Sequence, residues 1–117
     1  MFIRRLKSTS SSADREPCFE LRVADTLYTR FMGLMFKPGI QHDQGLLIKN
    51  CNWVHTLFMR FSIDVLYMDG TGKVVAVKRL KPFRLSTPVW GAVQVVEIQA
   101  GAAEYYAIVA GDRFVAG

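Results

Sequence analysis

Polar side chains interrupt the most apolar stretch of the chain, which runs from residue 53 to residue 70. His55, Thr56, Arg60 and Asp64 lie there among aromatic and aliphatic neighbours. An imidazole titrates near neutral pH, and a guanidinium group binds carboxylates or phosphates through two hydrogen bonds. Because a polar group in an apolar strand costs free energy unless it has a partner, we expect these side chains to meet one another, or a ligand, at one site.

A long loop predicted at residues 81–91 offers further contact groups. Pro82 and Pro88 disfavour regular structure there, and long loops in compact domains are often functional. Its basic side chains favour an anionic or polar ligand. We therefore predict a non-catalytic domain that binds a small polar or anionic ligand. The predicted ligand-binding residues are His55, Thr56, Met59, Arg60, Asp64, Arg84 and Trp90.

Two catalytic arrangements and a structural role stay open as alternatives. Asp64 and Glu97 would serve as the paired carboxylates of a hydrolase if both faced one cleft. Cys51 with His55 would instead supply a thiolate nucleophile and a base. In a structural or interaction protein, the polar residues of the stretch serve the fold alone. The sequence places the binding domain narrowly ahead of the structural role, with the hydrolase last.

Cysteine and histidine are too few and too widely spaced for a recognisable metal site. The chain contains Cys18, Cys51, His42 and His55, and no two of them have zinc-finger spacing. No glycine-rich phosphate loop or dinucleotide fingerprint is present either. We therefore predict no metal and no cofactor. One disulfide between the two cysteines is possible, although buried free thiols are the default.

Length and composition favour one domain spanning residues 1–117, with a flexible loop at 8–13. Half of the 117 residues are hydrophobic, enough for a core, and the net charge is +5. No nucleic-acid-binding motif accompanies the basic residues, so we expect a solvated face and no nucleic-acid partner. No apolar run reaches about 18 residues, and the N-terminus lacks a secretory signal. We expect a cytoplasmic protein without a membrane span, and its oligomeric state is left open.

The alternation of apolar and polar residues predicts mostly strands. They are expected at residues 2–7, 18–23, 45–50, 63–68, 73–80, 92–99 and 113–115. The segment Asp69-Gly70-Thr71-Gly72 is the strongest turn signal, and it joins two of these strands as a hairpin. The stretch from 53 to 70 is too long for one strand. We therefore expect a strand over residues 53–60 that breaks from the next one near Phe61-Ser62.

One main helix is expected at residues 26–36, because Leu27 begins an apolar stripe with helical spacing. A single helical turn is expected at residues 101–106. These elements together predict an α+β, mainly β domain. Its sheet would form a small antiparallel β-barrel or sandwich of six to seven strands, with the main helix packed against it.

Short motifs recur along most of the chain. They are Arg30 with Gly33-Leu34-Met35, His55-Thr56, Met59-Arg60-Phe61, Ile63-Asp64, Val96-Glu97-Ile98, Ala100-Gly101 and Gly111-Asp112. Their combination resembles the signature of domain-of-unknown-function family 192, a group of small prokaryotic proteins, and it covers the chain from about Cys18 to the end. Ser62 stands where that family usually has proline, so the bend there is less enforced. The resemblance implies a β-rich α+β fold and no particular reaction.

Overall fold

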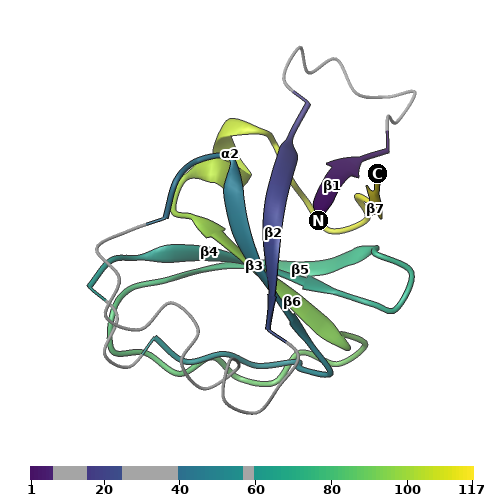
Figure 1. The fold of residues 1–117 in the computed structure, drawn as a ribbon. Coiled ribbons are helices and arrows are strands. Elements are labelled where there is room, and N and C mark those ends of the chain that lie inside the picture. Colours follow the sequence, from purple (N-terminus) through teal and green to yellow (C-terminus); the bar gives the residue numbers. More distant parts are fainter. Residues whose placement is uncertain (7–15, 25–39, 57–59) are drawn as a thin grey trace.

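The computed structural model describes residues 1–6, 16–24, 40–56 and 60–117. Within this part of the chain, seven strands form one twisted sheet with a short helix beside it (Figure 1). In chain order the elements are β1 (Phe2–Arg5), β2 (Cys18–Ala24), β3 (Gln44–Lys49), β4 (Ile63–Met68), β5 (Val74–Leu80), β6 (Gln94–Gln99), α2 (Ala102–Tyr105) and β7 (Phe114–Ala116). The strand order is β5-β4-β6-β3-β2-β1-β7. Only β2 and β3 pair in parallel; the other neighbours are antiparallel.

Strand β4 lies inside the sheet and is buried along its whole length. It pairs with β5 on one side and with β6 on the other, while both of its faces are covered. Alternation sorts its side chains between two cores. Leu66 and Met68 pack with Ala102 of α2, whereas Val65 and Tyr67 pack in a second core on the opposite side of the sheet. We call these two sides the α2 face and the loop face.

The β4–β5 hairpin closes on the turn that the sequence predicts. Asp69 Oδ1 accepts hydrogen bonds from the Thr71 hydroxyl (2.6 Å) and from the backbone amides of Thr71 (2.8 Å) and Lys73 (3.0 Å). The Thr71 hydroxyl, and after it these amides, hold the pKa of Asp69 below its usual value. The strand register shifts between Tyr67 and Met68, next to the turn. The predicted hairpin is confirmed.

The two edge strands, β5 and β7, approach each other at one end only. The Val74 amide donates to Asp112 O (2.7 Å), and the Phe114 amide donates to Gly72 O (2.9 Å). Gly72 has a φ of 88°, and a Cβ added there would collide with the Phe114 carbonyl oxygen, so this approach requires glycine. Beyond this end β5 and β7 do not pair. The sheet is therefore not closed as a barrel.

The prediction of a mainly β fold with six to seven strands is thus confirmed, and its barrel or sandwich detail is not. The helical turn predicted at 101–106 corresponds to α2. The predicted main helix at 26–36 and the loop at 8–13 lie outside the described residues. No helix within the described ranges is long and apolar enough to cross a membrane.

Among the described residues from 53 to 70, the strand β4 lies in the second half of the stretch. Strand β4 begins at Ile63, so the predicted break near Phe61-Ser62 is confirmed. The prediction of a strand before this break is wrong for residues 53–56, where a single bridge joins His55 to Leu85. The backbone of these residues bonds instead to a loop that carries no strand periodicity.

Asp64 ties β4 to β5 and to α2 on the α2 face. Its Oδ1 accepts a hydrogen bond from Arg79 Nε (3.0 Å), and its Oδ2 accepts from the backbone amides of Gly101 (2.9 Å) and Ala103 (3.1 Å). The Asp64 side chain is 3% exposed, whereas that of Arg79 is 51% exposed. The carboxylate thus supplies acceptors that the first amides of a helix lack within the helix itself.

Asp64→Ala should destabilise the domain by about 3 kcal/mol, because two buried amides lose a charged acceptor. Urea unfolding followed by tryptophan fluorescence measures this loss. The matched control is Arg79→Ala, which should cost much less because the half-exposed guanidinium is screened by solvent. Equal losses in the two variants, or no loss in Asp64→Ala, would contradict this structural role.

Candidate functional site

Residues 51–56 and 81–93 run side by side and form what we call the paired loops. Backbone hydrogen bonds link them at several levels. They are Phe83 N to Thr56 O (2.9 Å), Thr56 N to Arg84 O (2.8 Å), Ser86 N to Val54 O (2.9 Å) and Val89 N to Asn52 O (3.0 Å). Because their polar backbone groups are bonded to each other, the paired loops have a defined conformation without belonging to the sheet.

The Thr56 hydroxyl lies at one end of this pairing and bonds to the opposite loop. It donates to Lys81 O (2.6 Å) and accepts from the Arg84 backbone amide (2.8 Å). The residue is fully buried. These bonds answer the requirement that a polar side chain in an apolar segment find partners. They also fix the turn from which the Arg84 side chain leaves the backbone.

The paired loops pack on the loop face of the sheet. Val54 and Ala92 are buried there, and the half-buried Cys51 and Val89 pack against the same core. A link to β5 comes from Lys78, whose ammonium group donates to the Thr87 hydroxyl (3.1 Å) and lies 5.3 Å from the centre of the Tyr67 ring. The loops are therefore anchored both by apolar contact and by a cation from the sheet.

Two ionisable groups are buried on the loop face beneath the paired loops. Glu97 lies in β6 between Leu46 of β3 and Val65 of β4, and burial raises the pKa of its carboxyl to about 8. Tyr67 is also fully buried, and its hydroxyl has no hydrogen-bond partner among the described residues. The pKa of the Tyr67 hydroxyl is raised, chiefly by burial. The neighbouring Ser86 opposes this rise, and Glu97 adds to it.

Ser86 lies close to the Tyr67 hydroxyl without completing a hydrogen bond to it. The Ser86 oxygen instead accepts from the Val54 backbone amide (2.9 Å). The loop face thus places a neutral carboxylic acid and a phenol near each other in an apolar core. An isolated buried polar group of this kind is costly to the fold.

The structure brings some of the predicted ligand-binding residues together and separates others. His55, Thr56 and Arg84 lie together in the paired loops. Trp90 lies at the far end of the same loops, in a turn closed by a hydrogen bond from Ala92 N to Val89 O (3.2 Å).

Of the other three predicted residues, Asp64 lies apart from this group. Arg60 is exposed a few residues beyond Thr56. Met59 lies outside the described residues. Asp64 is on the opposite face of the sheet, where Arg79 and α2 occupy its carboxylate.

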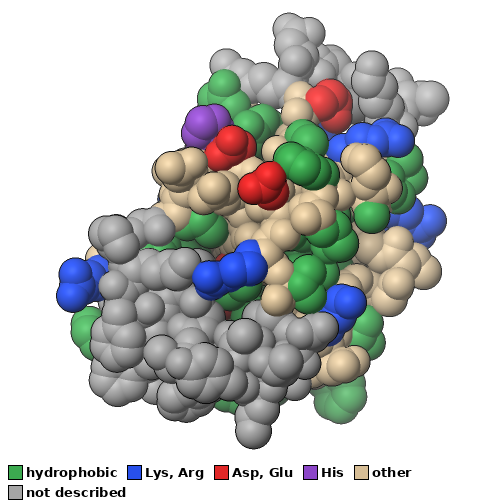
Figure 2. All heavy atoms as spheres, in the orientation of Figure 1, with side chains coloured by type: hydrophobic (Ala, Val, Ile, Leu, Met, Phe, Trp, Pro, Cys, Tyr) green, Lys and Arg blue, Asp and Glu red, His purple; other side chains and the backbone are tan. Residues whose placement is uncertain are grey.

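The paired loops expose aromatic and basic side chains to solvent. Trp90 is 94% exposed and Phe83 is 63% exposed, and Trp53 and Leu85 are exposed as well. Arg84 and Lys81 are exposed in the same loop. On the face shown in Figure 2, acidic side chains gather in the upper part, while Lys and Arg side chains lie apart from one another. The charge available for an anion on this face therefore comes from individual residues.

The described residues do not bring the predicted carboxylate pair together. Asp64 pairs with Ile98 and Glu97 pairs with Val65 in the β4–β6 register, so their carboxyl groups point to opposite faces of the sheet. The hydrolase alternative based on Asp64 and Glu97 therefore lacks the converging carboxylates that it requires. In the other predicted pair, Cys51 with His55, the Cys51 thiol donates to the Trp53 carbonyl oxygen (2.7 Å).

Both cysteines are free. Cys18 is exposed and Cys51 is half-buried, so neither is the fully buried thiol expected from the sequence.

Arg79 was not among the predicted partners of Asp64. The hairpin signal indicates that a β5 residue lies opposite Asp64, but the turn at residues 69–72 alone would place Val77 there, and the observed register, which shifts between Tyr67 and Met68, brings Arg79 to this position. The Tyr67 hydroxyl carries no comparable signal, since a tyrosine in an apolar strand is normally part of the core.

Glu97→Gln should remove a pH dependence from folding stability. The pKa of the carboxyl is about 8 in the folded protein against an ordinary 4.5. Below about pH 4.5 the group is protonated in both states, and stability is highest with respect to it. As the pH rises to about 8, only the unfolded chain ionises, so stability falls. Urea unfolding between about pH 5 and pH 8.5 should show a smaller loss in the variant than in the wild type.

The matched control is Glu104→Gln, because the Glu104 side chain is exposed on α2. This control should keep the wild-type dependence on pH. If Glu97→Gln also keeps the wild-type dependence of stability on pH, the buried carboxyl is not the source of that dependence.

Two solved structures share this fold over nearly the whole chain. A protein of unknown function from Novosphingobium aromaticivorans matches with a TM-score of 0.83 and 19% identity, over 98% of this chain and 84% of that one. A protein from Sinorhizobium meliloti, provisionally described as a transcription regulator, matches with a TM-score of 0.81 and 18% identity, over 97% of this chain and 91% of that one. At such identities the likeness shows a common fold alone.

Sequence relatives are found among archaea. The UPF0127 protein of Pyrococcus furiosus is 38% identical over 103 residues, which cover 85% of this chain and 88% of that protein. The UPF0127 protein of Thermococcus sibiricus is 33% identical over 98 residues, and the chain spans 63% of its length. The family model DUF192, described as "Uncharacterized ACR", matches residues 8–116. The chain therefore belongs to the DUF192 family of uncharacterised proteins, as its motifs imply.

Proposed function

We propose that this protein is a non-catalytic binding domain whose paired loops hold a small organic anion with a planar ring. The observation that carries the proposal is the contrast within these loops. Their backbone is fixed by hydrogen bonds around Thr56, while Trp90, Phe83 and Arg84 project into solvent. Rigid backbone that presents aromatic and cationic side chains is typical of binding surfaces.

The chemistry of the exposed groups defines the ligand class. Arginine remains charged at all physiological pH values and pairs with phosphate or carboxylate groups, so Arg84 favours an anion. Tryptophan supplies a flat apolar face for stacking, so Trp90 favours a ring. His55 lies beside this surface, with its ring centre 6.4 Å from that of Trp53.

Backbone strain at Phe83 gives the proposal further support. Phe83 has a φ of 61°, a left-handed conformation that costs a non-glycine residue about 1 kcal/mol or more. The strained residue is also mostly exposed, so it gains little from burial. Conformational strain retained at an exposed aromatic residue is a feature of binding sites.

A structural or interaction role is the second candidate. It is favoured by Thr56 and Asp64, two members of the predicted site whose side-chain oxygens are bonded within the fold. A purely structural role does not account for the exposure of Trp90 and Arg84. We therefore retain the binding domain as the main proposal, with Thr56 as a positioning residue and without Asp64.

Binding of phenyl phosphate tests the proposal, since this probe combines an anion and a ring. Isothermal titration calorimetry should detect it, with weaker binding of inorganic phosphate and none of glucose. Arg84→Ala should weaken binding about tenfold, equivalent to the loss of one charged hydrogen bond. Trp90→Ala should weaken it several-fold. Neither variant should lower the melting temperature, because both side chains are exposed.

The control variant is Arg113→Ala, which removes an exposed arginine outside the paired loops. Its affinity for phenyl phosphate should equal that of the wild type. If no probe binds, or if all three variants lose affinity equally, the proposal fails and the interaction role takes its place.

A further inference from the structure

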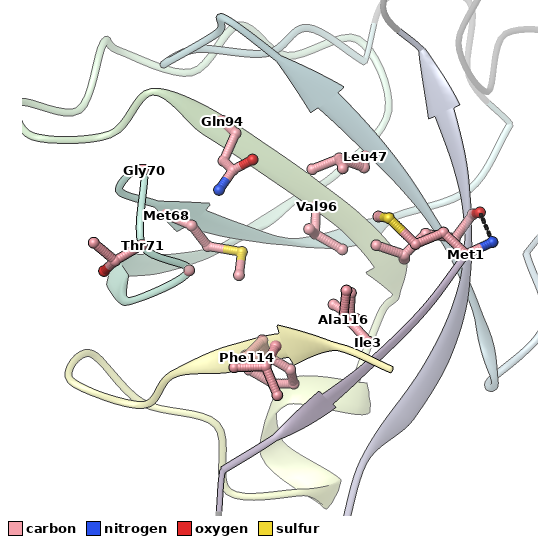
Figure 3. A pocket seen from close by; sticks show the side chains of 13 residues that line it. Met1, Ile3, Leu47, Met68, Gly70, Thr71, Gln94, Val96, Phe114 and Ala116 are labelled. Atoms are coloured by element: carbon pink, nitrogen blue, oxygen red, sulfur yellow. Dashed lines mark hydrogen bonds between the residues drawn. The ribbon is translucent and has the colours of Figure 1, made fainter.

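We propose that the α2 face holds a second binding site, a pocket that takes a neutral and mainly aliphatic small molecule. The pocket has a volume of about 310 Å³. It lies where the curled sheet brings β7 and β1 toward the end of the β4–β5 hairpin (Figure 3). This site shares no residue with the paired loops and does not depend on their function.

The walls of the pocket are apolar and come from strands far apart in the chain. Met68 of β4, Val96 of β6, Leu47 of β3 and Phe114 of β7 line it, and all four are buried. Their side chains point into the same space in Figure 3. A methionine in such a wall adapts to ligands of different shape, because its side chain is unbranched and flexible.

Gln94 and Thr71 supply neutral polar side chains at the rim of the pocket. The Gln94 amide nitrogen donates to the Asp69 carbonyl oxygen (2.9 Å), and the Thr71 hydroxyl donates to the Asp69 carboxylate (2.6 Å). These bonds fix Gln94 and Thr71 in place. No described residue donates to the Gln94 carbonyl oxygen, so this atom can accept a hydrogen bond from a ligand.

The lining residues include no ionisable side chain, and the terminal ammonium group of Met1 donates to the Leu21 carbonyl oxygen (3.4 Å; Figure 3). A charged ligand group among the apolar walls would lose its hydration without an ionisable side chain to pair with. A hydroxyl group would instead find the Gln94 oxygen at the rim. The lining therefore favours a neutral alcohol over a carboxylate of the same length.

The volume sets the size of the ligand. An apolar protein cavity of about 150 Å³ stays dry and holds benzene. A pocket about twice as large accepts a molecule of roughly ten non-hydrogen atoms. An eight-carbon primary alcohol meets this size and the polarity of the rim.

Titration with 1-butanol, 1-hexanol and 1-octanol tests the inference on the full chain. The methyl resonance of Met68, observed after labelling methionine methyl groups, should shift on binding. Each added methylene contributes about 0.8 kcal/mol, so the dissociation constant should fall roughly fourfold per carbon. Octanoate should bind at least tenfold more weakly than 1-octanol.

Ala116→Leu provides the structural test, because Ala116 lines the pocket at an exposed position where a larger side chain does not disturb the core. This variant should weaken 1-octanol binding at least tenfold. The control Ala110→Leu makes the same change at an exposed residue outside the pocket and should bind like the wild type.

Three results would overturn the inference. They are a Met68 methyl resonance that does not shift up to the solubility limit of 1-octanol, equal affinity in Ala116→Leu and the wild type, and tighter binding of octanoate than of 1-octanol.

Discussion

The hydrogen bonds of the Thr56 hydroxyl are the contacts on which the candidate site depends. One buried oxygen donates to Lys81 O and accepts from Arg84 N, and so it joins two segments that the sheet does not hold. Backbone bonds from Thr56 to Asn52 extend this pairing along both loops. Because the connection is made by backbone and by one small side chain, the larger side chains of the loops are left free to face solvent.

The sheet adds a second constraint by separating its polar residues between two faces. Alternation along β4 and β6 directs Asp64 to the α2 face and Glu97 to the loop face. Asp64 is fully bonded and fastens α2, whereas Glu97 is held as a neutral acid in an apolar core. The two carboxyl groups therefore serve separate purposes, and chemistry that needs both at one site is not available to this fold.

Much of the fold follows from local patterns in the sequence. The turn at Asp69-Gly70 and the alternation on either side of it predict the β4–β5 hairpin, and the same alternation predicts which side chains of β2 are buried. The pairing of β4 with β6 was not predictable in this way, because these strands are far apart in the chain and only their register separates Asp64 from Glu97. The prolines predicted the loop at residues 81–91, but its pairing with residues 51–56 gave no signal, since loop-to-loop hydrogen bonds have no sequence period. The composition of the stretch from residue 53 to residue 70 indicates that its polar residues need hydrogen-bond partners. It does not indicate which residues those partners are.

Native-state hydrogen exchange at the amides of Phe83, Ser86 and Val89 tests the central claim most directly. All three donate to the opposite loop, so their exchange should be slowed strongly relative to an unstructured chain. The amide of Trp90, at the exposed tip, provides an internal reference that should exchange faster. Rates at Phe83, Ser86 and Val89 equal to those of an unstructured chain would contradict the account, because the loops would then have no fixed pairing with which to present Arg84 and Trp90.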